Sequence, residues 1–306
     1  MQLLYSYVRT LRPIGWIPAW FAMTMGMIDG GFFSLTKVFL ALLVFGPLVL
    51  GANYILNFVA DLKLDKLNAG KKDLEMASQP FSTGLIAPRQ GYVVALILTL
   101  GGLIISSFIS PWFFLFAAYS ALIGTAYSLG PRLKSRPFFD LIANASTFGA
   151  AAYLAGWSAF QPLNAVSISS LVWITLLVGA TYILTVLLDA VSDKQGGQTT
   201  IATYFGTKKS LHLSFILYGL SSISFLIALY THSLTVAYWI LAPFIILGLK
   251  SYLKLIRDPS RIHHVAKRGV FSAVFGVTTL IPIYVVLTIL GISDETIIRM
   301  ILNAFG

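Results

Sequence analysis

Runs of about 20 apolar residues recur along this chain, and they constrain its fold more than any other feature. As α-helices, runs of this length match the hydrocarbon thickness of a membrane. Their approximate cores are residues 14–30, 37–60, 91–109, 111–128, 138–160, 168–190, 210–231, 234–253 and 270–292. Only 10% of the residues are charged, whereas ordinary soluble domains carry about 25% charged residues.

No segment shows the alternating polar and apolar pattern of barrel strands. The chain is therefore predicted to be an all-α polytopic membrane protein, a bundle of nine transmembrane helices. We expect a single domain over residues 1–306. Its polar connections are predicted to form loops at about 61–90, 129–137, 190–209 and 254–269.

The basic residues are distributed unevenly between alternate connections. All of them except Lys37 and Arg299 lie before the first run, in the even-numbered connections or, for Lys250, at the end of the eighth run. Because positive residues favour the cytoplasmic side, the N-terminus and these four loops are predicted to be cytoplasmic, with the C-terminus outside. The same bias explains the net charge of +10, so no nucleic-acid partner is expected. The basic stretch from Lys250 to Arg268 is expected to meet anionic lipid headgroups, or to act only as a topology signal.

Four polar residues recur at every fourth position at the end of the second run: Asn53, Asn57, Asp61 and Asp65. On a helix, each step of four residues advances by about 40°, so the four side chains form one slowly drifting stripe. Two interpretations compete. The stripe is either a structural polar seam between helices or a set of oxygen ligands for a cation such as Mg²⁺.

A second acidic pair, Asp189 and Asp193, closes the sixth run on the same predicted side of the membrane. The second and sixth runs occupy equivalent places in two four-helix halves, to which the ninth helix is added. Four carboxylates brought together repel one another unless a cation binds them. Mg²⁺ prefers carboxylate, amide and water oxygens and commonly shares them with substrate phosphates, so the second pair favours a Mg²⁺ site. Asn57 is expected to supply a neutral oxygen ligand or a hydrogen bond.

These motifs resemble the UbiA superfamily of intramembrane prenyltransferases. The resemblance rests on the pattern Asn57-x3-Asp61-x3-Asp65 and the later Asp189-x3-Asp193. It extends to Arg12-Pro13, to Tyr127-Ser-Leu-Gly-Pro-Arg-Leu-Lys134 and to Thr200-Ile-Ala-x-x-Phe205-Gly206. Together, in this order, the fragments cover essentially the whole chain, and members of the superfamily have nine transmembrane helices.

The chain departs from the superfamily at some positions. Phe58 stands where many members carry a further Asp, and Gln79 stands in place of Arg. Gln198 and Thr199 stand where many members place basic residues. These departures leave the predicted metal ligands in place and bear on the identity of the substrate.

The resemblance implies that an isoprenyl diphosphate binds through Mg²⁺ to the catalytic residues Asp61, Asp65, Asp189 and Asp193, helped by Asn57. The further candidates for the diphosphate are Lys72, Tyr127, Arg132, Lys134 and Lys194, with arginine suited to bidentate contacts. Asn53 lies one turn deeper, where an acceptor or the first prenyl carbons are expected. The implied acceptor is lipophilic: an aromatic quinone precursor, a prenylglycerol phosphate or a tetrapyrrole-like molecule.

Two alternative functions remain at this point. Some members of the superfamily cyclise a prenyl diphosphate or elongate a carotenoid, with the same metal site. An ion-coupled transporter is a more distant alternative, because it predicts charged residues near the middle of the membrane and these carboxylates lie at helix ends. Asp140 and Asn144, at the start of the fifth run, fit either a polar site or helix capping and interhelical bonding.

Overall fold

The computed structural model describes residues 2–67 without 32 and 33, residues 80–262 without 82, 83, 232, 233 and 235, and positions 264, 265, 286 and 290. Every regular element in this part of the chain is helical. The α-helices are α1 (Gln2–Thr10), α2 (Ile17–Asp29), α3 (Leu35–Leu43), α4 (Val49–Leu67), α5 (Pro88–Ser107), α6 (Pro111–Ser128), α7 (Phe139–Asn144), α8 (Ala152–Ser158), α9 (Ile168–Gln195), α10 (Ile201–Tyr230) and α11 (Ala242–Arg257). Short 3₁₀ turns are η1 (Pro13–Trp16), η3 (Leu133–Ser135), η5 (Leu163–Ala165), η6 (Val236–Leu241) and η7 (Pro259–Arg261).

Two π-helical segments join shorter helices into longer rods. Segment η2 (Val44–Leu48) connects α3 to α4, and segment η4 (Ala145–Ala151) connects α7 to α8. The first has a clear cause, because Pro47 lacks an N–H and its ring displaces the helix backbone, which leaves Gly46 outside helical geometry. Trp20 packs against Gly46 and donates its indole N–H to the carbonyl of Leu42 at 3.0 Å.

The helices coincide with the first eight predicted runs. The ninth run, 270–292, lies outside the described residues apart from two isolated positions, so the count of nine is not established. Within the described ranges, four rods are individually long and apolar enough to cross a membrane: Leu35–Leu62, Pro88–Ser107, Ile168–Gln195 and Ile201–Tyr230. The predicted loop at 190–209 is mostly helical, because α9 continues to Gln195 and α10 begins at Ile201.

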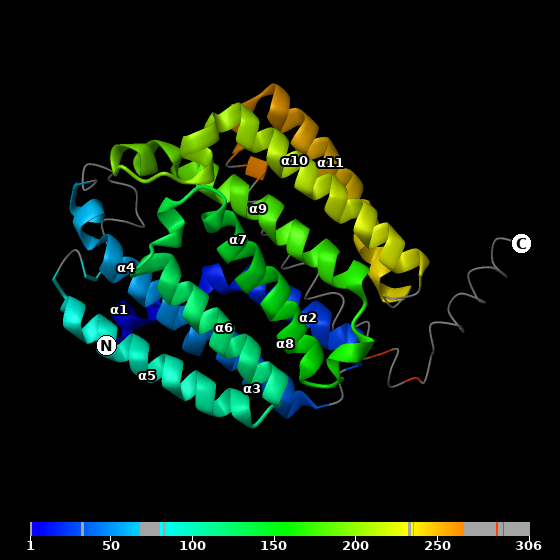
Figure 1. The fold of residues 1–306 in the computed structure, drawn as a ribbon, viewed down its shortest axis with the longest axis horizontal. Helices are drawn as coiled ribbons and strands as arrows, with labels where there is room; N and C mark the ends of the chain where they lie inside the picture. The colour runs from blue at the N-terminus through cyan, green and yellow to red at the C-terminus, as the bar shows by residue number, and fades with distance from the viewer. Residues whose placement is uncertain are drawn as a thin grey trace, which may run out of the picture.

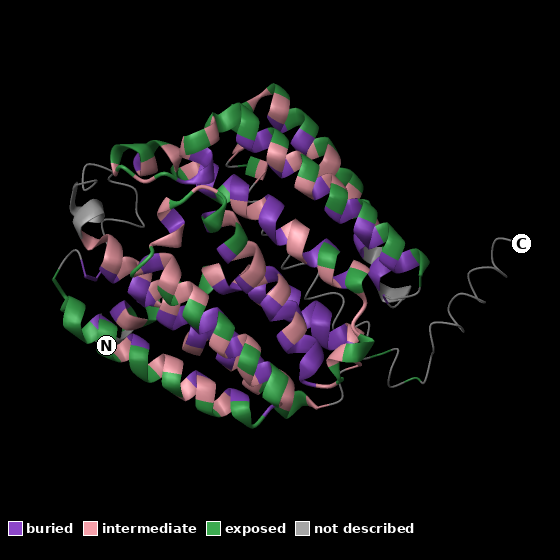
Figure 2. Ribbon diagram, in the orientation of Figure 1, coloured by how far each residue is buried: buried purple, intermediate pink, exposed green. Residues whose placement is uncertain are grey.

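The rods lie side by side, with α2 and α8 in the interior and α5, α10 and α11 at the edges (Figures 1 and 2). All eight residues from Phe21 to Ile28 in α2 are buried. Glycines bring α2 and α8 close together, since a Cβ on Gly26 would clash with the carbonyl oxygen of Tyr153 and one on Gly156 with that of Met23. Small residues allow such close approach between membrane helices.

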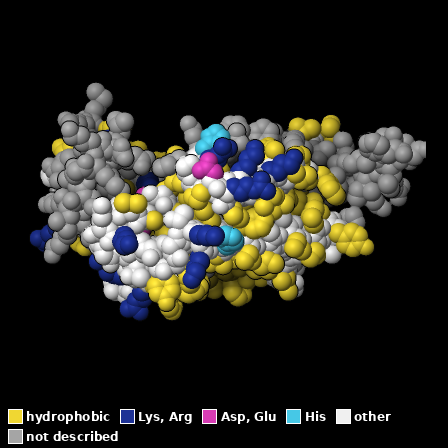
Figure 3. Space-filling model, turned by 90° about the horizontal axis from the view of Figure 1, so that it is seen from above, with side chains coloured by type: hydrophobic (Ala, Val, Ile, Leu, Met, Phe, Trp, Pro, Cys, Tyr) yellow, Lys and Arg dark blue, Asp and Glu magenta, His cyan; other side chains and the backbone are white. Residues whose placement is uncertain are grey.

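The outer surface of the bundle is apolar. Helix α5 exposes a ridge that includes Val93, Leu96, Ile97 and Ile104, each at least half exposed. Exposed apolar surface of this extent is unfavourable in water but suits contact with lipid tails. Figure 3 shows that Lys and Arg side chains gather on one part of the face seen from above, beside extensive hydrophobic surface. This distribution is that of an integral membrane protein.

Candidate functional site

A cavity of about 1600 Å³ opens between the rods, and most of the predicted site residues line it. Asn57 and Asp61 reach it from α4, and Asp189 and Asp193 reach it from α9. Its interior is lined by aromatic and aliphatic side chains, among them Phe21, Trp173, Phe225 and Leu241. The cavity lining therefore combines carboxylate and amide side chains with apolar side chains that suit a hydrocarbon chain.

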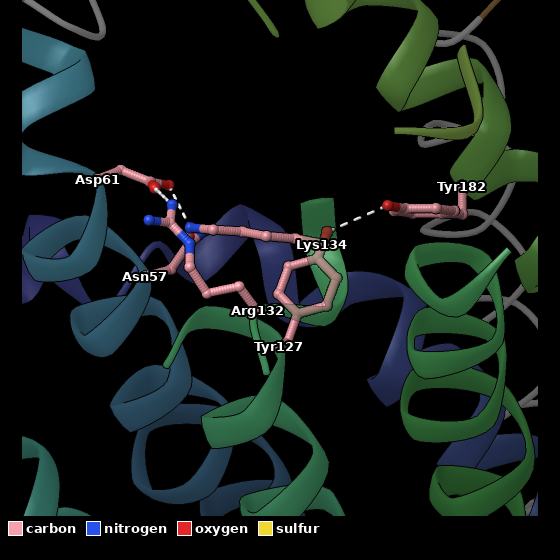
Figure 4. A network of polar contacts seen from close by, with 6 residues as sticks. All are labelled: Asn57, Asp61, Tyr127, Arg132, Lys134 and Tyr182. Atoms are coloured by element: carbon pink, nitrogen blue, oxygen red, sulfur yellow. Dashed lines mark hydrogen bonds and ion pairs between the residues drawn. The ribbon is translucent and has the colours of Figure 1, made fainter. Parts of the chain in front are cut away.

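Asp61 is the centre of a polar network near the end of α4 (Figure 4). Its Oδ2 atom lies 2.5 Å from Nζ of Lys134, and its Oδ1 atom lies 3.2 Å from Nη2 of Arg132. The Lys134 ammonium also donates to Oδ1 of Asn57 at 2.6 Å. Lys134 is only 4% exposed, so its charge is compensated within the protein by Asp61 and by polar oxygens. The structure thus brings four predicted site residues into one cluster.

The loop after α6 directs the two basic side chains toward Asp61. Gly130 and Arg132 both have left-handed backbones, with φ of 59° and 48°. Glycine adopts this conformation without strain, whereas a non-glycine residue is uncommon there. The two positions allow a tight reversal into η3, which places Lys134 back over α4.

Tyr127, at the end of α6, pairs with a residue on the opposite wall. Its hydroxyl lies 3.1 Å from the hydroxyl of Tyr182 on α9, and either group can be the donor (Figure 4). Both side chains line the cavity. The pair therefore connects the helix before the basic loop to the helix that carries Asp189.

The second acidic pair lies at the end of α9. Asp189 and Asp193 are one turn apart and both line the cavity, whereas Lys194 is exposed and does not. The chain then turns at Gly197, with φ of 70°, and Gln198 donates its backbone N–H to the carbonyl of Asp193 at 2.8 Å. Gln198 lines the cavity as well.

Other predicted residues divide between the cavity and the undescribed part of the chain. Asn53 lines the cavity, but its amide donates to the carbonyl of Ser120 at 3.0 Å. Asp65 lies in the last turns of α4, and its side chain is not among those described. Lys72 and Gln79 lie outside the described residues.

Arg12, which belongs to the Arg12-Pro13 motif, also lines the cavity. Its guanidinium lies 5.6 Å from the ring centroid of Tyr54, a cation–π geometry. Tyr54 is held in place because its hydroxyl donates to the carbonyl of Gly15 at 3.0 Å. The position of this arginine directly before Pro13 is the sequence feature that could have predicted a further cationic group in the site.

Asp140 is a structural residue, which settles the alternative left open by its sequence position. It is fully buried, and its Oδ2 accepts the backbone N–H of Ile201 at 2.8 Å while its Oδ1 accepts that of Leu141 at 2.7 Å. The carboxylate therefore caps the first turn of α10 from α7. This contact fixes the start of α10 beside the Gln198 turn.

We expect Asp140→Ala to destabilise the protein by about 1–3 kcal/mol, because the buried N–H of Ile201 loses its acceptor. Thermal unfolding in detergent micelles measures the effect. Asp140→Asn keeps one acceptor oxygen and should lose less. An unchanged unfolding temperature for Asp140→Ala would show that the cap is not needed.

The oxygen donors that line the cavity are of the type that a hard cation prefers. In this structure, however, they do not form a preassembled metal site. Asn57, Asp61, Asp189 and Asp193 all supply oxygen atoms, as Mg²⁺ prefers. Among the described residues, no three or more acidic or histidine side chains are grouped closely enough to hold a metal ion by themselves. A substrate that contributes its own phosphate oxygens would complete such a site.

Comparison with known proteins defines the class. The model of the UbiA prenyltransferase family matches residues 15–275, so the chain belongs to this family. It is a UbiA-type membrane prenyltransferase. The fold is that of a solved UbiA homologue from Archaeoglobus fulgidus bound to GPP and Mg²⁺, with a TM-score of 0.72 over 90% of this chain and 100% of that one, at 23% identity.

Similar curated proteins include a bacteriochlorophyll synthase chain and a lycopene elongase/hydratase. The bacteriochlorophyll synthase 34 kDa chain of Chloroflexus aurantiacus is 25% identical over 265 residues, which is 84% of this chain and 82% of that protein. A lycopene elongase/hydratase of Corynebacterium glutamicum is 28% identical over 183 residues, which is 56% of this chain and 59% of that protein.

Proposed function

We propose that the protein transfers an isoprenyl group from a prenyl diphosphate to a lipophilic acceptor, with the diphosphate held as a Mg²⁺ complex between α4 and α9. One observation carries the proposal. Asp61 and the Asp189–Asp193 pair come from separate helices, yet all three line one cavity whose lining is largely apolar. Asp65 is proposed as a further ligand from its spacing, and Asn57 as a neutral one.

The reaction breaks the bond between the allylic carbon and the diphosphate oxygen, and the electron pair leaves with the diphosphate. Bound Mg²⁺ would neutralise the negative charge that develops on this leaving group. Arg132 and Lys134 would hold the same oxygens, with Arg12 as a further cation beside them. Lys72 and Lys194 are proposed for this role from sequence alone, and Lys194 must turn inward to take part.

The allylic carbon then bonds to a nucleophilic atom of the acceptor. A neutral acceptor passes the proton that it loses to the departing diphosphate, whereas an ionised acceptor has no proton to lose. Until that bond forms, the positive carbon must be kept from water. Aromatic rings shield and stabilise cations through their π faces. Tyr127, Tyr182, Phe21 and Trp173 all line the cavity. We assign the two tyrosines to shielding of the cation, and the apolar lining that includes Phe21 and Trp173 to the prenyl chain. Asn53 is proposed to face the acceptor or the first prenyl carbons.

We place a tetrapyrrole-like acceptor first, since the similarity to the bacteriochlorophyll synthase chain extends over most of both proteins. Prenylglycerol phosphates and aromatic quinone precursors follow. Carotenoid elongation is the second candidate function, favoured by the shorter match to the lycopene elongase/hydratase.

Product analysis distinguishes these functions. Purified protein is incubated with labelled prenyl diphosphates of several chain lengths, each acceptor class in turn, and Mg²⁺ or EDTA. We expect the label to join one acceptor class, to be lost with EDTA and to return with excess Mg²⁺. Hydrocarbon formed without any acceptor would support a cyclase. Full transfer in EDTA would contradict the metal site.

We further propose that residues 1–306 form one domain of nine transmembrane helices, two four-helix halves and one more, with the N-terminus and the acidic mouth of the cavity in the cytoplasm. The charge bias and the eight described helical rods support this proposal. The loops at about 61–90, 129–137, 190–209 and 254–269 would then face the cytoplasm. Helix ends within them, such as the first turns of α10, would extend beyond the membrane.

Cysteine labelling tests this topology without background, because the chain contains no cysteine. Thr36 and Arg136 are both exposed, the first at the start of α3 and the second in the loop after η3. We expect a membrane-impermeant maleimide to label Thr36→Cys in intact cells and Arg136→Cys only after the membrane is opened. The reverse pattern would invert the proposed orientation.

A further inference from the structure

Lys134 already occupies the place where a cation is expected beside Asp61. Its ammonium contacts Oδ2 of Asp61 at 2.5 Å and Oδ1 of Asn57 at 2.6 Å. Arg132 contacts the other carboxylate oxygen at 3.2 Å. Both oxygens of Asp61 are thus engaged by cationic side chains, and so is the amide oxygen proposed as a neutral ligand.

This arrangement has a consequence for metal binding. A divalent ion that approached Asp61 would meet a buried positive charge and would have to displace it. Moving the Lys134 ammonium away from Asp61 is costly, because a buried ammonium that loses its oxygen partners is strongly destabilised. Metal alone offers Lys134 no replacement for the oxygens that it would lose.

A diphosphate does offer that replacement. Its oxygens accept hydrogen bonds from lysine and arginine, and charge-assisted contacts of this kind are strong. The lysine side chain has a flexible four-carbon stem, so the ammonium can change partners while the backbone of η3 stays in place. Arg132 is free to follow, since its side chain is 43% exposed.

We propose that Lys134, assisted by Arg132, is an internal counter-ion that keeps Asp61 and Asn57 from binding metal until a diphosphate arrives. The diphosphate takes over Lys134 and Arg132, and Asp61 becomes a metal ligand in the same event. The site therefore binds metal and diphosphate together and binds metal alone weakly. This inference rests on the proposed function and adds an order of binding to it.

Equilibrium dialysis of the purified protein against Mn²⁺, with and without inorganic diphosphate, tests the inference. Without diphosphate, we expect Lys134→Gln to bind Mn²⁺ at least tenfold more tightly than the unmodified protein. Arg132→Gln, which removes the more exposed cation, should bind about threefold more tightly. With diphosphate present, the unmodified protein should gain at least tenfold in Mn²⁺ affinity.

Lys37→Gln is the matched control. Lys37 is also a lysine with a hydrogen-bonded ammonium, which donates to the carbonyl of Ala159 at 2.9 Å. It lies 24 residues before Asp61 on the same rod, roughly 36 Å away along a helix. Lys37→Gln lowers the net charge by the same amount as Lys134→Gln. We expect its Mn²⁺ affinity to equal that of the unmodified protein.

The outcomes separate the inference from the proposed function. If neither Lys134→Gln nor Arg132→Gln binds Mn²⁺ more tightly without diphosphate, the counter-ion role is wrong. The proposed metal site then still stands if the unmodified protein retains Mn²⁺ with diphosphate and Asp189→Asn does not. If the unmodified protein retains no Mn²⁺ even with diphosphate, both are overturned. If Lys134→Gln does not fold, the Mn²⁺ affinity of Arg132→Gln without diphosphate decides whether the counter-ion role is correct.

Discussion

Replacing either Asp61 or Asp189 by Asn should lower the rate of prenyl transfer by about 10²- to 10³-fold or more. Each substitution removes one negative charge from the lining of the cavity and keeps the shape of the side chain. Asparagine at position 61 still offers Lys134 an oxygen, which alanine would not, so the ammonium keeps a partner. Initial rates with saturating prenyl diphosphate and Mg²⁺ measure the effect.

Asp258→Asn is the control for this prediction. Asp258 also pairs with an arginine, Arg261, at 2.8 Å, but both side chains are about half exposed at the surface. Such a pair is screened by solvent, so its loss should leave both activity and stability unchanged. If Asp61→Asn or Asp189→Asn is folded and keeps full activity, the proposed metal site is wrong.

The second large effect concerns the contact between α2 and α8. Gly26→Ala and Gly156→Ala should each destabilise the protein by about 1–3 kcal/mol or more, because the added methyl group meets a backbone carbonyl of the facing helix. Backbone cannot move aside as a flexible side chain does, so the two helices must separate. Thermal unfolding in detergent micelles, followed by helical circular dichroism, measures the loss.

Gly101→Ala serves as the comparison for the two interior glycines. Gly101 lies in α5, and a Cβ there has no neighbouring atom within 4 Å. Alanine also favours a helix over glycine, so stability should be unchanged or slightly higher. Equal unfolding temperatures for Gly26→Ala, Gly156→Ala and the unmodified protein would mean that α2 and α8 do not approach as closely as described.

Helix positions were the most predictable part of the fold. Long apolar runs can satisfy their backbone groups in a membrane only as helices, so eight predicted runs coincide with helical rods. The π-helical segments were not predicted, because they depend on how the chain relieves strain at positions such as Pro47. Helix α1 was not predicted either, because the segment 2–10 is short and mixes polar with apolar residues, unlike a transmembrane helix.

The site was predictable where it depends on helical spacing and not where it depends on packing. Asp189 and Asp193 share a face because they are four residues apart, and both line the cavity. Lys194 was assigned to the diphosphate because it follows Asp193, yet consecutive helical residues point about 100° apart, and its side chain is exposed. The pairing of Lys134 with Asp61 joins residues 73 positions apart and needs the folded structure.

Determining where the metal binds tests the proposed site most directly. A structure of the protein with Mn²⁺ and a non-reactive prenyl diphosphate analogue, with the metal located by its anomalous scattering, supplies that measurement. We predict Mn²⁺ between Asp61 and the Asp189–Asp193 pair, bridged by the diphosphate, with Lys134 moved from Asp61 to a phosphate oxygen. Mn²⁺ bound elsewhere, or a bound diphosphate with Asp61 still paired to Lys134 and no metal beside it, would contradict the account.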